Sequence, residues 1–141
     1  MRLIRSILAP LRAVWSDRRR APRYYPPLEK RWIVSATPVR KSPPSGAAER
    51  TPSAISGYVL DLSENGLLLS LPAVSVDGIN IADPDYRLRV LLGLPFKTVT
   101  MYATTVRCEE VPKEDYLVAV EITEMSSTER EHYTEFLRRL N

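Results

Sequence analysis

The strongest constraint on the fold is a series of short strand-forming segments between residues 31 and 122, separated by clusters of turn-forming residues. The segments are rich in valine, leucine, threonine and tyrosine, which favour extended backbone. Serine, asparagine, glycine and proline interrupt them at residues 63–65, 93–95 and 111–115. This pattern is typical of an antiparallel sheet of short strands. The expected strands are residues 31–39, 56–62, 66–71, 86–94, 98–109 and 116–122.

The second and third of these segments are separated by only three residues, Ser63 to Asn65, and are therefore expected to pair as a hairpin. Residues 40–53 contain proline, serine and alanine but almost no large apolar side chain, which predicts a flexible loop. Residues 72–84 are expected to be irregular.

The chain ends in the pattern of an amphipathic helix, residues 126–140. Ser126 can cap its N-terminus, and Glu129 stands three residues later, as in a capping box. The only histidine, His132, is predicted to lie on the polar side of this helix. One apolar stripe is expected to cover the core, and it consists of Tyr133, Phe136, Leu137 and Leu140. The predicted fold is a mainly β, six-stranded antiparallel barrel with a C-terminal helix.

The chain is expected to form one domain, because 141 residues, 44% of them hydrophobic, suit a single core. That domain would span residues 17–141, preceded by an amphipathic segment at residues 1–16. Within this segment, Pro10 interrupts a helical pattern of apolar residues. Its apolar face could dock on an anionic membrane or a partner protein, or it could pack against the body of the protein itself.

Positive charge is concentrated near the N-terminus. Residues 1–50 carry ten arginines and two lysines against three acidic residues, a net charge of +9, whereas the rest of the chain carries a net charge of −6. An anionic partner would therefore be attracted to the N-terminal part. Charge alone leaves nucleic acid, anionic lipid and a phosphorylated small ligand open.

The sequence argues against catalysis. His132 stands alone, far from any glycine-rich elbow, and no cluster of histidine or cysteine has the spacing of a metal site. The single cysteine, Cys108, cannot form an intramolecular disulfide, which favours a reducing compartment and hence the cytoplasm. No apolar run is long enough to span a membrane. We expect a protein that is not an enzyme and needs no metal or cofactor.

The arginine-rich segment at residues 17–27 is suited to binding an anionic nucleotide. Arg19 and Arg23 are four residues apart, Arg18 precedes them, and prolines at positions 22, 26 and 27 favour extended chain over helix. A guanidinium group can grip a phosphate with two hydrogen bonds, stack on a base, or donate to the O6/N7 edge of guanine. Taken alone, such a run is also typical of a solvated tail.

Residues 61–66 form a second motif, Asp-x-Ser-x-x-Gly, at the predicted hairpin turn. Asp61 could accept hydrogen bonds from a guanine edge or cap the backbone N–H groups of the turn itself. Ser63 offers a short hydroxyl to backbone or phosphate. Gly66 permits a positive φ angle at the exit of the turn, or the close approach of a ligand. The motif alone is also compatible with an ordinary turn.

Together, in this order, the two motifs resemble those of the PilZ domain family, whose members bind the bacterial second messenger cyclic di-GMP. In that family an arginine motif precedes the first barrel strand, and an Asp/Asn-x-Ser-x-x-Gly box ends the second. Residues 57–67 are similar to the second element, and residues 116–130 resemble the last strand and the start of the C-terminal helix. The resemblance covers roughly residues 17–140.

The resemblance implies a role for each motif residue. Arg19 and Arg23 would hold the phosphates and contact the guanines, while Asp61 and Ser63 would recognise a guanine from the barrel surface and Gly66 would shape the turn. A basic residue at the position of Arg18 is associated in the family with binding a stacked dimer of the ligand.

The sequence therefore predicts a bacterial receptor that does no chemistry. Cyclic di-GMP would order residues 17–27 over the barrel, and an unidentified downstream protein would receive the signal. This receptor is expected to bind no specific nucleic acid. One alternative is a small barrel that binds nucleic acid through the basic N-terminal part. The other is an adaptor that ignores the nucleotide and docks on a partner or, peripherally, on a membrane through residues 1–16.

Overall fold

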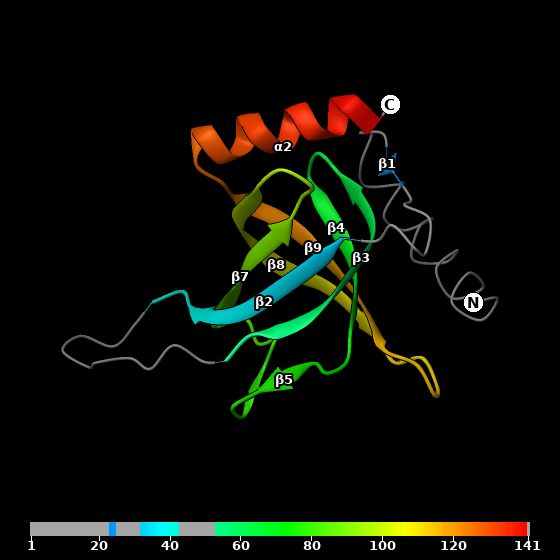
Figure 1. The fold of residues 1–141 in the computed structure, drawn as a ribbon. Helices are drawn as coiled ribbons and strands as arrows, with labels where there is room; N and C mark the ends of the chain where they lie inside the picture. The colour runs from blue at the N-terminus through cyan, green and yellow to red at the C-terminus, as the bar shows by residue number, and fades with distance from the viewer. Residues whose placement is uncertain (1–22, 25–31, 43–52, 141) are drawn as a thin grey trace.

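The computed structural model describes residues 23–24, 32–42 and 53–140, which form a strand-rich body with one long helix (Figure 1). The elements in chain order are β1 (Arg23–Tyr24), β2 (Ile33–Arg40), β3 (Ile55–Ser63), β4 (Gly66–Leu71), β5 (Ser75–Val76), β6 (Ile79–Asn80), β7 (Tyr86–Gly93), β8 (Thr98–Glu109), β9 (Tyr116–Glu124) and α2 (Ser127–Leu140). The amphipathic segment at residues 1–16 and most of the predicted loop at residues 40–53 lie outside the described residues.

Six of the strands close into a barrel. The order around it is β3-β2-β7-β8-β9-β4, and β4 pairs back with β3, so that every neighbouring pair is antiparallel. Closure leaves the barrel without an open sheet edge. The predicted fold class is thereby confirmed, and the six expected strands differ from the observed ones by at most two residues at each end.

The prediction of an irregular segment at residues 72–84 was wrong in part, because β5 and β6 form a small hairpin there. Asp77 and Gly78 connect the two strands, with φ angles of 52° and 79°. Positive φ at both central residues is the requirement of the tight turn that matches strand twist, and an Asp-Gly pair meets it readily. The prolines at positions 72 and 84 obscured this signal in the sequence.

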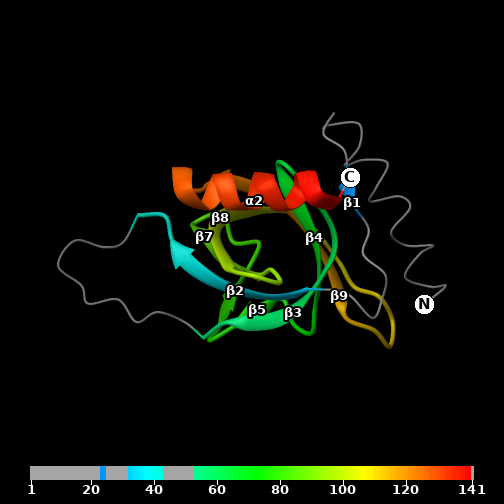
Figure 2. The same ribbon diagram turned by 45° about the horizontal axis from the view of Figure 1, so that its top comes forward.

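Apolar side chains fill the barrel, and α2 closes one end of it (Figure 2). Tyr133 of the helix is fully buried in this core, and the rest of its apolar stripe packs against the core, as predicted. The largest fully buried residues are Tyr133, Leu62, Leu67, Leu69, Leu71, Ile81, Leu88, Leu92, Met101, Leu117, Val34 and Val59.

The start of α2 is capped and fastened to the barrel by adjacent residues. The Ser126 hydroxyl accepts a hydrogen bond from the Glu129 backbone N–H at 3.2 Å, which confirms the predicted cap. The Glu129 carboxylate accepts a bond from the Thr100 backbone N–H of β8 at 3.0 Å. The acidic residue of the capping motif thus ties the helix to a barrel strand.

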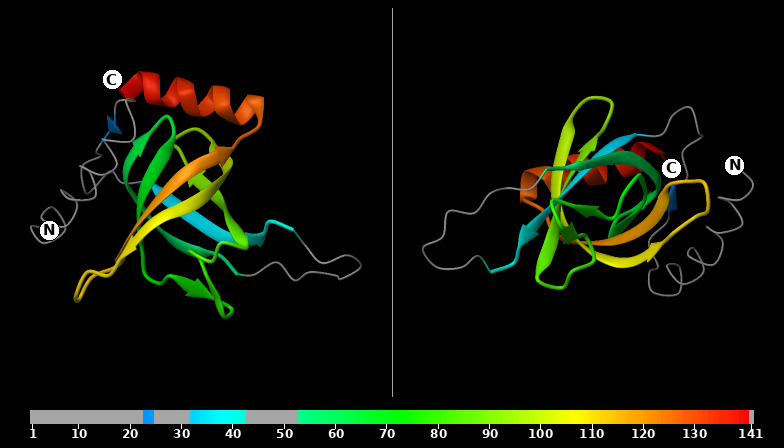
Figure 3. Two further views of the ribbon diagram at one scale, coloured as in Figure 1. Left: turned by 180° about the vertical axis from the view of Figure 1, so that it is seen from behind. Right: turned by 90° about the horizontal axis from the view of Figure 1, so that it is seen from below.

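A second, smaller apolar cluster lies outside the barrel. The β8–β9 hairpin extends well beyond the barrel wall (Figure 3), and Val111 near its tip is buried against Leu60 of β3 and Leu68 of β4. Leu117 and Ala119 of β9 complete the cluster. The hairpin thereby shields the outer face of β3 just before the Asp61 motif.

Gly57 allows β3 to pass close to β4. A Cβ atom at this position would lie 2.0 Å from the Ser70 backbone oxygen and 2.9 Å from a methyl group of Leu71, whereas at Gly93 of β7 the nearest atom would be the Ile33 oxygen, at 3.4 Å. Both contacts at Gly57 are too short for a real Cβ atom, whereas the contact at Gly93 is an ordinary van der Waals contact.

We expect Gly57→Ala to lower the free energy of unfolding by about 3 kcal/mol, because the backbone of β3 or β4 must shift to admit the methyl group. Gly93→Ala is the matched control and should change stability by less than about 1 kcal/mol. Urea unfolding followed by circular dichroism measures both. Equal stability of the two variants would show that β3 and β4 do not approach as closely as described.

Candidate ligand-binding site

The two sequence motifs meet through backbone pairing. β1 is antiparallel to β3, with Arg23 opposite Ser63 and Tyr24 opposite Leu62. Leu62 also pairs with Leu67 of β4, so β1 and β4 occupy opposite edges of β3. The end of the arginine motif therefore lies beside the Asp-x-Ser-x-x-Gly box. β1 lies on the same edge of β3 as β2, which pairs with an earlier part of β3, residues 55–58.

Not every residue of the arginine motif can be located. Arg18 and Arg19 lie outside the described residues, and for Arg23 only the backbone is described. The assignment of ligand contacts to these side chains stays a prediction.

A β-bulge just before Asp61 determines which face of β3 carries the side chains of the Asp-x-Ser-x-x-Gly box. The register of β3 against β4 shifts between Val59, which faces Leu69, and Asp61, which faces Leu68, so that Leu60 is the additional residue. Leu62 points into the core, and side chains alternate along a strand, so Asp61 and Ser63 belong to its other face. Bulges often re-aim a side chain next to a functional site.

Both polar residues of the box are shielded from water. Asp61 is 2% exposed and Ser63 is fully buried. The Ser63 hydroxyl donates a hydrogen bond to the Gly66 carbonyl at 3.4 Å, across the β3–β4 turn. A charged or hydroxylated group in such a dry environment interacts more strongly with a polar ligand than it would in water.

Gly66 does not use a positive φ angle, so that sequence expectation was wrong. Among the described residues, the only glycine with positive φ is Gly78. Gly66 begins β4 in extended conformation and faces Glu121 of β9. The alternative expectation, that a glycine here permits close approach of a ligand, is not affected.

Every carbonyl of the turn at residues 63–65 accepts a hydrogen bond from elsewhere in the chain. The Tyr133 hydroxyl of α2 donates to the Ser63 carbonyl at 2.5 Å, and the Arg130 guanidinium donates to the Glu64 carbonyl at 3.1 Å. The Ile122 backbone N–H of β9 donates to the Asn65 carbonyl at 2.8 Å. The terminal helix and the last strand thus hold the box in one conformation.

This role of the helix was not evident from the sequence. The apolar stripe identified Tyr133 as a core residue, but its hydroxyl contacts a turn 70 positions earlier in the chain. The one available signal was chemical, since a buried tyrosine hydroxyl usually needs a partner.

Tyr133 and the box also interact electrostatically. Burial raises the pKa of the Tyr133 hydroxyl far above its ordinary value of 10.0, and the negative charge of Asp61 raises it further. Arg130 opposes this shift, and Glu64 adds to it. The hydroxyl therefore remains a hydrogen-bond donor across the physiological pH range.

In the described ranges, no group of three or more histidine, cysteine, aspartate or glutamate side chains could hold a metal ion. Over the same residues, no helix has the length and apolar character that crossing a bilayer requires.

The sequence model of the PilZ domain family matches residues 17–139, and the chain therefore belongs to this family of small β-barrel domains. Among solved structures, it is similar to the PilZ domain with c-di-GMP of YcgR from Escherichia coli. The TM-score is 0.59 and the identity 13%, over 87% of this chain and 91% of the other.

The chain is also similar to the Bacillus subtilis inhibitor of motility (MotI/DgrA), with a TM-score of 0.56 and 16% identity over 86% of this chain. It spans 50% of that protein's length. At such identities both similarities concern the fold. A search of the curated proteins found no significant match.

We expect Tyr133→Phe to lower the free energy of unfolding by about 1–3 kcal/mol at neutral pH, because the buried Ser63 carbonyl loses its donor. Thermal and urea unfolding measure the change. Leu137→Met, a change of similar volume on the same stripe, is the control and should cost less than about 1.5 kcal/mol. A Tyr133→Phe variant as stable as the parent would contradict this role of the hydroxyl.

The same tyrosine predicts a loss of stability in alkali. Its pKa is raised in the folded state, so its contribution is fully present below the unfolded-state pKa of 10.0 and is lost as the pH rises above it. Above about pH 10 the parent should lose up to about 1.4 kcal/mol per pH unit more than Tyr133→Phe does. Parallel pH profiles of the two proteins would contradict the shift.

Proposed function

We propose that the protein is a bacterial, cytoplasmic receptor for cyclic di-GMP and that it catalyses no reaction. The observation that carries the proposal is the β1–β3 pairing, which sets the backbone of Arg23 beside Ser63. The solved relative from Escherichia coli, a PilZ domain with c-di-GMP, supports the same ligand.

The chemistry of the ligand matches both motifs. Cyclic di-GMP carries two phosphates and two guanines, and arginine side chains bind phosphates bidentately and contact guanine by stacking or through its O6/N7 edge. We assign these contacts to Arg19 and Arg23. A carboxylate can accept hydrogen bonds from the N1–H and amino group of guanine, and we assign this contact to Asp61, with Ser63 beside it.

Residues 17–27 are proposed to fold over the barrel face when the ligand binds. The segment is basic, rich in proline and poor in apolar residues, so the ligand would supply most of the energy that orders it. This ordering would change the surface that a downstream protein meets. Because Arg18 precedes the motif, we propose that the ligand binds as a stacked dimer.

Isothermal titration calorimetry with cyclic di-GMP, with GTP as the control nucleotide, tests the proposal. We expect saturable heat with the first ligand and none with the second, and a stoichiometry of two ligands per protomer. A stoichiometry of one would retain the receptor but exclude the dimer. The absence of heat at ligand concentrations well above micromolar would contradict the proposal and favour an adaptor that docks through residues 1–16.

Substitution of either motif arginine should weaken binding without unfolding the protein. We expect Arg19→Ala and Arg23→Ala each to cost about 1.5–3 kcal/mol of binding free energy, or roughly tenfold to 150-fold in Kd, through lost charged hydrogen bonds. Arg40→Ala, exposed at the end of β2 that pairs with Tyr86 of β7 and not with β3, is the matched control and should bind like the parent. If both motif variants bind normally, the site is wrongly assigned.

Hydrogen exchange with and without cyclic di-GMP tests the proposed ordering. We expect slower exchange of the amides in residues 17–27 on binding, because a segment held over the barrel opens less often. The amides of β7, on the other side of β2, serve as the internal control. Unchanged exchange in residues 17–27 at saturating ligand would contradict the ordering step.

A further inference from the structure

A groove with an apolar floor lies between α2 and the turn that joins β7 to β8. Its volume is about 460 Å³, and it opens to solvent. The turn contributes Leu94, Phe96 and Lys97, and the helix contributes four residues at the spacing of one helical face, namely His132, Glu135, Phe136 and Arg139. We refer to this feature as the α2 groove.

Phe96 presents its ring to solvent at the tip of a hydrogen-bonded turn. Leu94 and Lys97 exchange two backbone hydrogen bonds, of 3.0 and 3.3 Å, which closes a two-residue turn at the tip of the β7–β8 hairpin. Phe96 is 87% exposed at this tip, while Leu94 and Phe136 pack partly against the core below. An exposed aromatic ring beside an apolar hollow is typical of the anchor of a protein interface.

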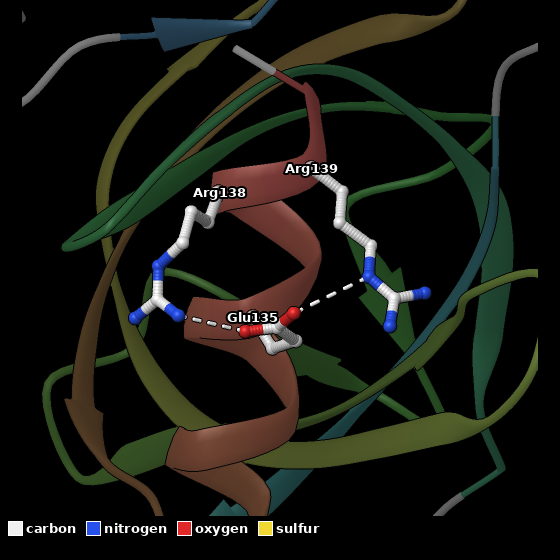
Figure 4. Close-up of polar contacts among 3 residues, drawn as sticks. All are labelled: Glu135, Arg138 and Arg139. Carbon is white, nitrogen blue, oxygen red and sulfur yellow. Dashed lines mark hydrogen bonds and ion pairs between the residues drawn. The ribbon is translucent and has the colours of Figure 1, made fainter.

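The rim of the α2 groove is positively charged. Glu135 accepts hydrogen bonds from Arg138 at 2.8 Å and from Arg139 at 3.3 Å, so one carboxylate is shared by two guanidinium groups (Figure 4). Lys97 lies on the opposite wall. Among the side chains that line the groove, Lys97 and Arg139 are positive and Glu135 is negative, which gives a formal net charge of +1.

His132 adds a polar group to the wall of the groove that α2 forms. It is partly buried and lines the groove four positions before Phe136. Its Nδ1 atom is buried, and within the described residues it has no hydrogen-bond partner.

We propose that the α2 groove is a docking surface for an acidic segment of a partner protein, anchored by a large apolar side chain. The apolar floor accepts the anchor, and Lys97 and Arg139 pair with the acidic side chains. A second copy of this chain, docked groove to groove, would bring an equally basic rim. Residues 1–16 of the chain carry three arginines and no acidic residue. Charge thus disfavours both of these occupants.

The groove is connected to the surroundings of the candidate site through Trp32 and through helix α2. Phe136 packs edge-to-face on Trp32, with ring centroids 5.1 Å apart and an interplanar angle of 84°. Trp32 follows closely after the arginine-rich segment, and Arg130 and Tyr133 of the same helix hold the turn after Asp61. We assign the groove as the output surface of the receptor, a role that rests on the proposed function, whereas docking itself does not require the nucleotide.

The test is selection of a phage-displayed library of random 16-residue peptides on the full-length protein, followed by fluorescence anisotropy with the enriched peptides. We expect enrichment of peptides that combine aspartate or glutamate with leucine, phenylalanine or tryptophan. Phe96→Ser and Arg139→Glu should each weaken their binding at least tenfold. Val106→Ser and Arg107→Glu are the control variants. They make comparable changes at exposed positions of β8 that do not line the groove, and they should have no effect.

A charge exchange makes the test specific. Replacement of the peptide's acidic residues by lysine should abolish binding to the parent and restore it to Arg139→Glu. Enrichment of basic peptides, or binding that Phe96→Ser does not weaken, would overturn the proposal. So would tighter binding of a synthetic peptide of residues 1–16, or self-association in sedimentation that Phe96→Ser abolishes.

Saturating cyclic di-GMP should change peptide affinity at least threefold, and unchanged affinity in a protein that binds the nucleotide would overturn the output role. Calorimetry with cyclic di-GMP on Phe96→Ser separates the two proposals. We expect parental nucleotide affinity, because Phe96 is in the β7–β8 turn and outside both motifs. A parent that binds no nucleotide but binds acidic peptides at the groove would contradict the proposed function and retain the docking surface.

Discussion

The antiparallel pairing of β3 on both of its edges is the constraint on which the rest of the structure depends. Along one edge β4 closes the barrel, and along the other β2 pairs first and β1 continues beyond it. Gly57 permits the close approach of β3 to β4, and the bulge at Leu60 turns the strand before Asp61. One strand therefore both completes the core and brings together two motifs that are about forty residues apart in the sequence.

The terminal helix has three structural roles, which explains its tight attachment to the barrel. Its apolar stripe covers the core, and Arg130 and Tyr133 hold the turn beside the candidate site. Phe136 of this stripe, together with His132, Glu135 and Arg139, also forms a wall of the α2 groove. One helix therefore contacts both the turn beside the candidate site and the groove, and contiguous contact of this kind is one through which coupling can act.

The strands and the helix were predictable because each is bounded by local signals, such as the turn residues at 63–65 and the Ser126 cap. Features set by contacts between distant segments were not. The bulge at Leu60, for example, depends on the register of β3 against β4. The candidate site was predicted from its motifs, but the clamp formed by Tyr133 was not, since no local pattern links a helix to a turn 70 residues earlier.

The most direct test of the central claim, that the two motifs form one nucleotide site, is a crystal structure of the protein with cyclic di-GMP. The account predicts that the ligand lies between the arginine-rich segment and the outer face of β3. Arg19 and Arg23 would be within hydrogen-bonding distance of phosphate or guanine, and the Asp61 carboxylate would face the N1–H and amino group of a guanine. A ligand bound elsewhere, with the arginines and Asp61 both outside contact distance, would contradict it.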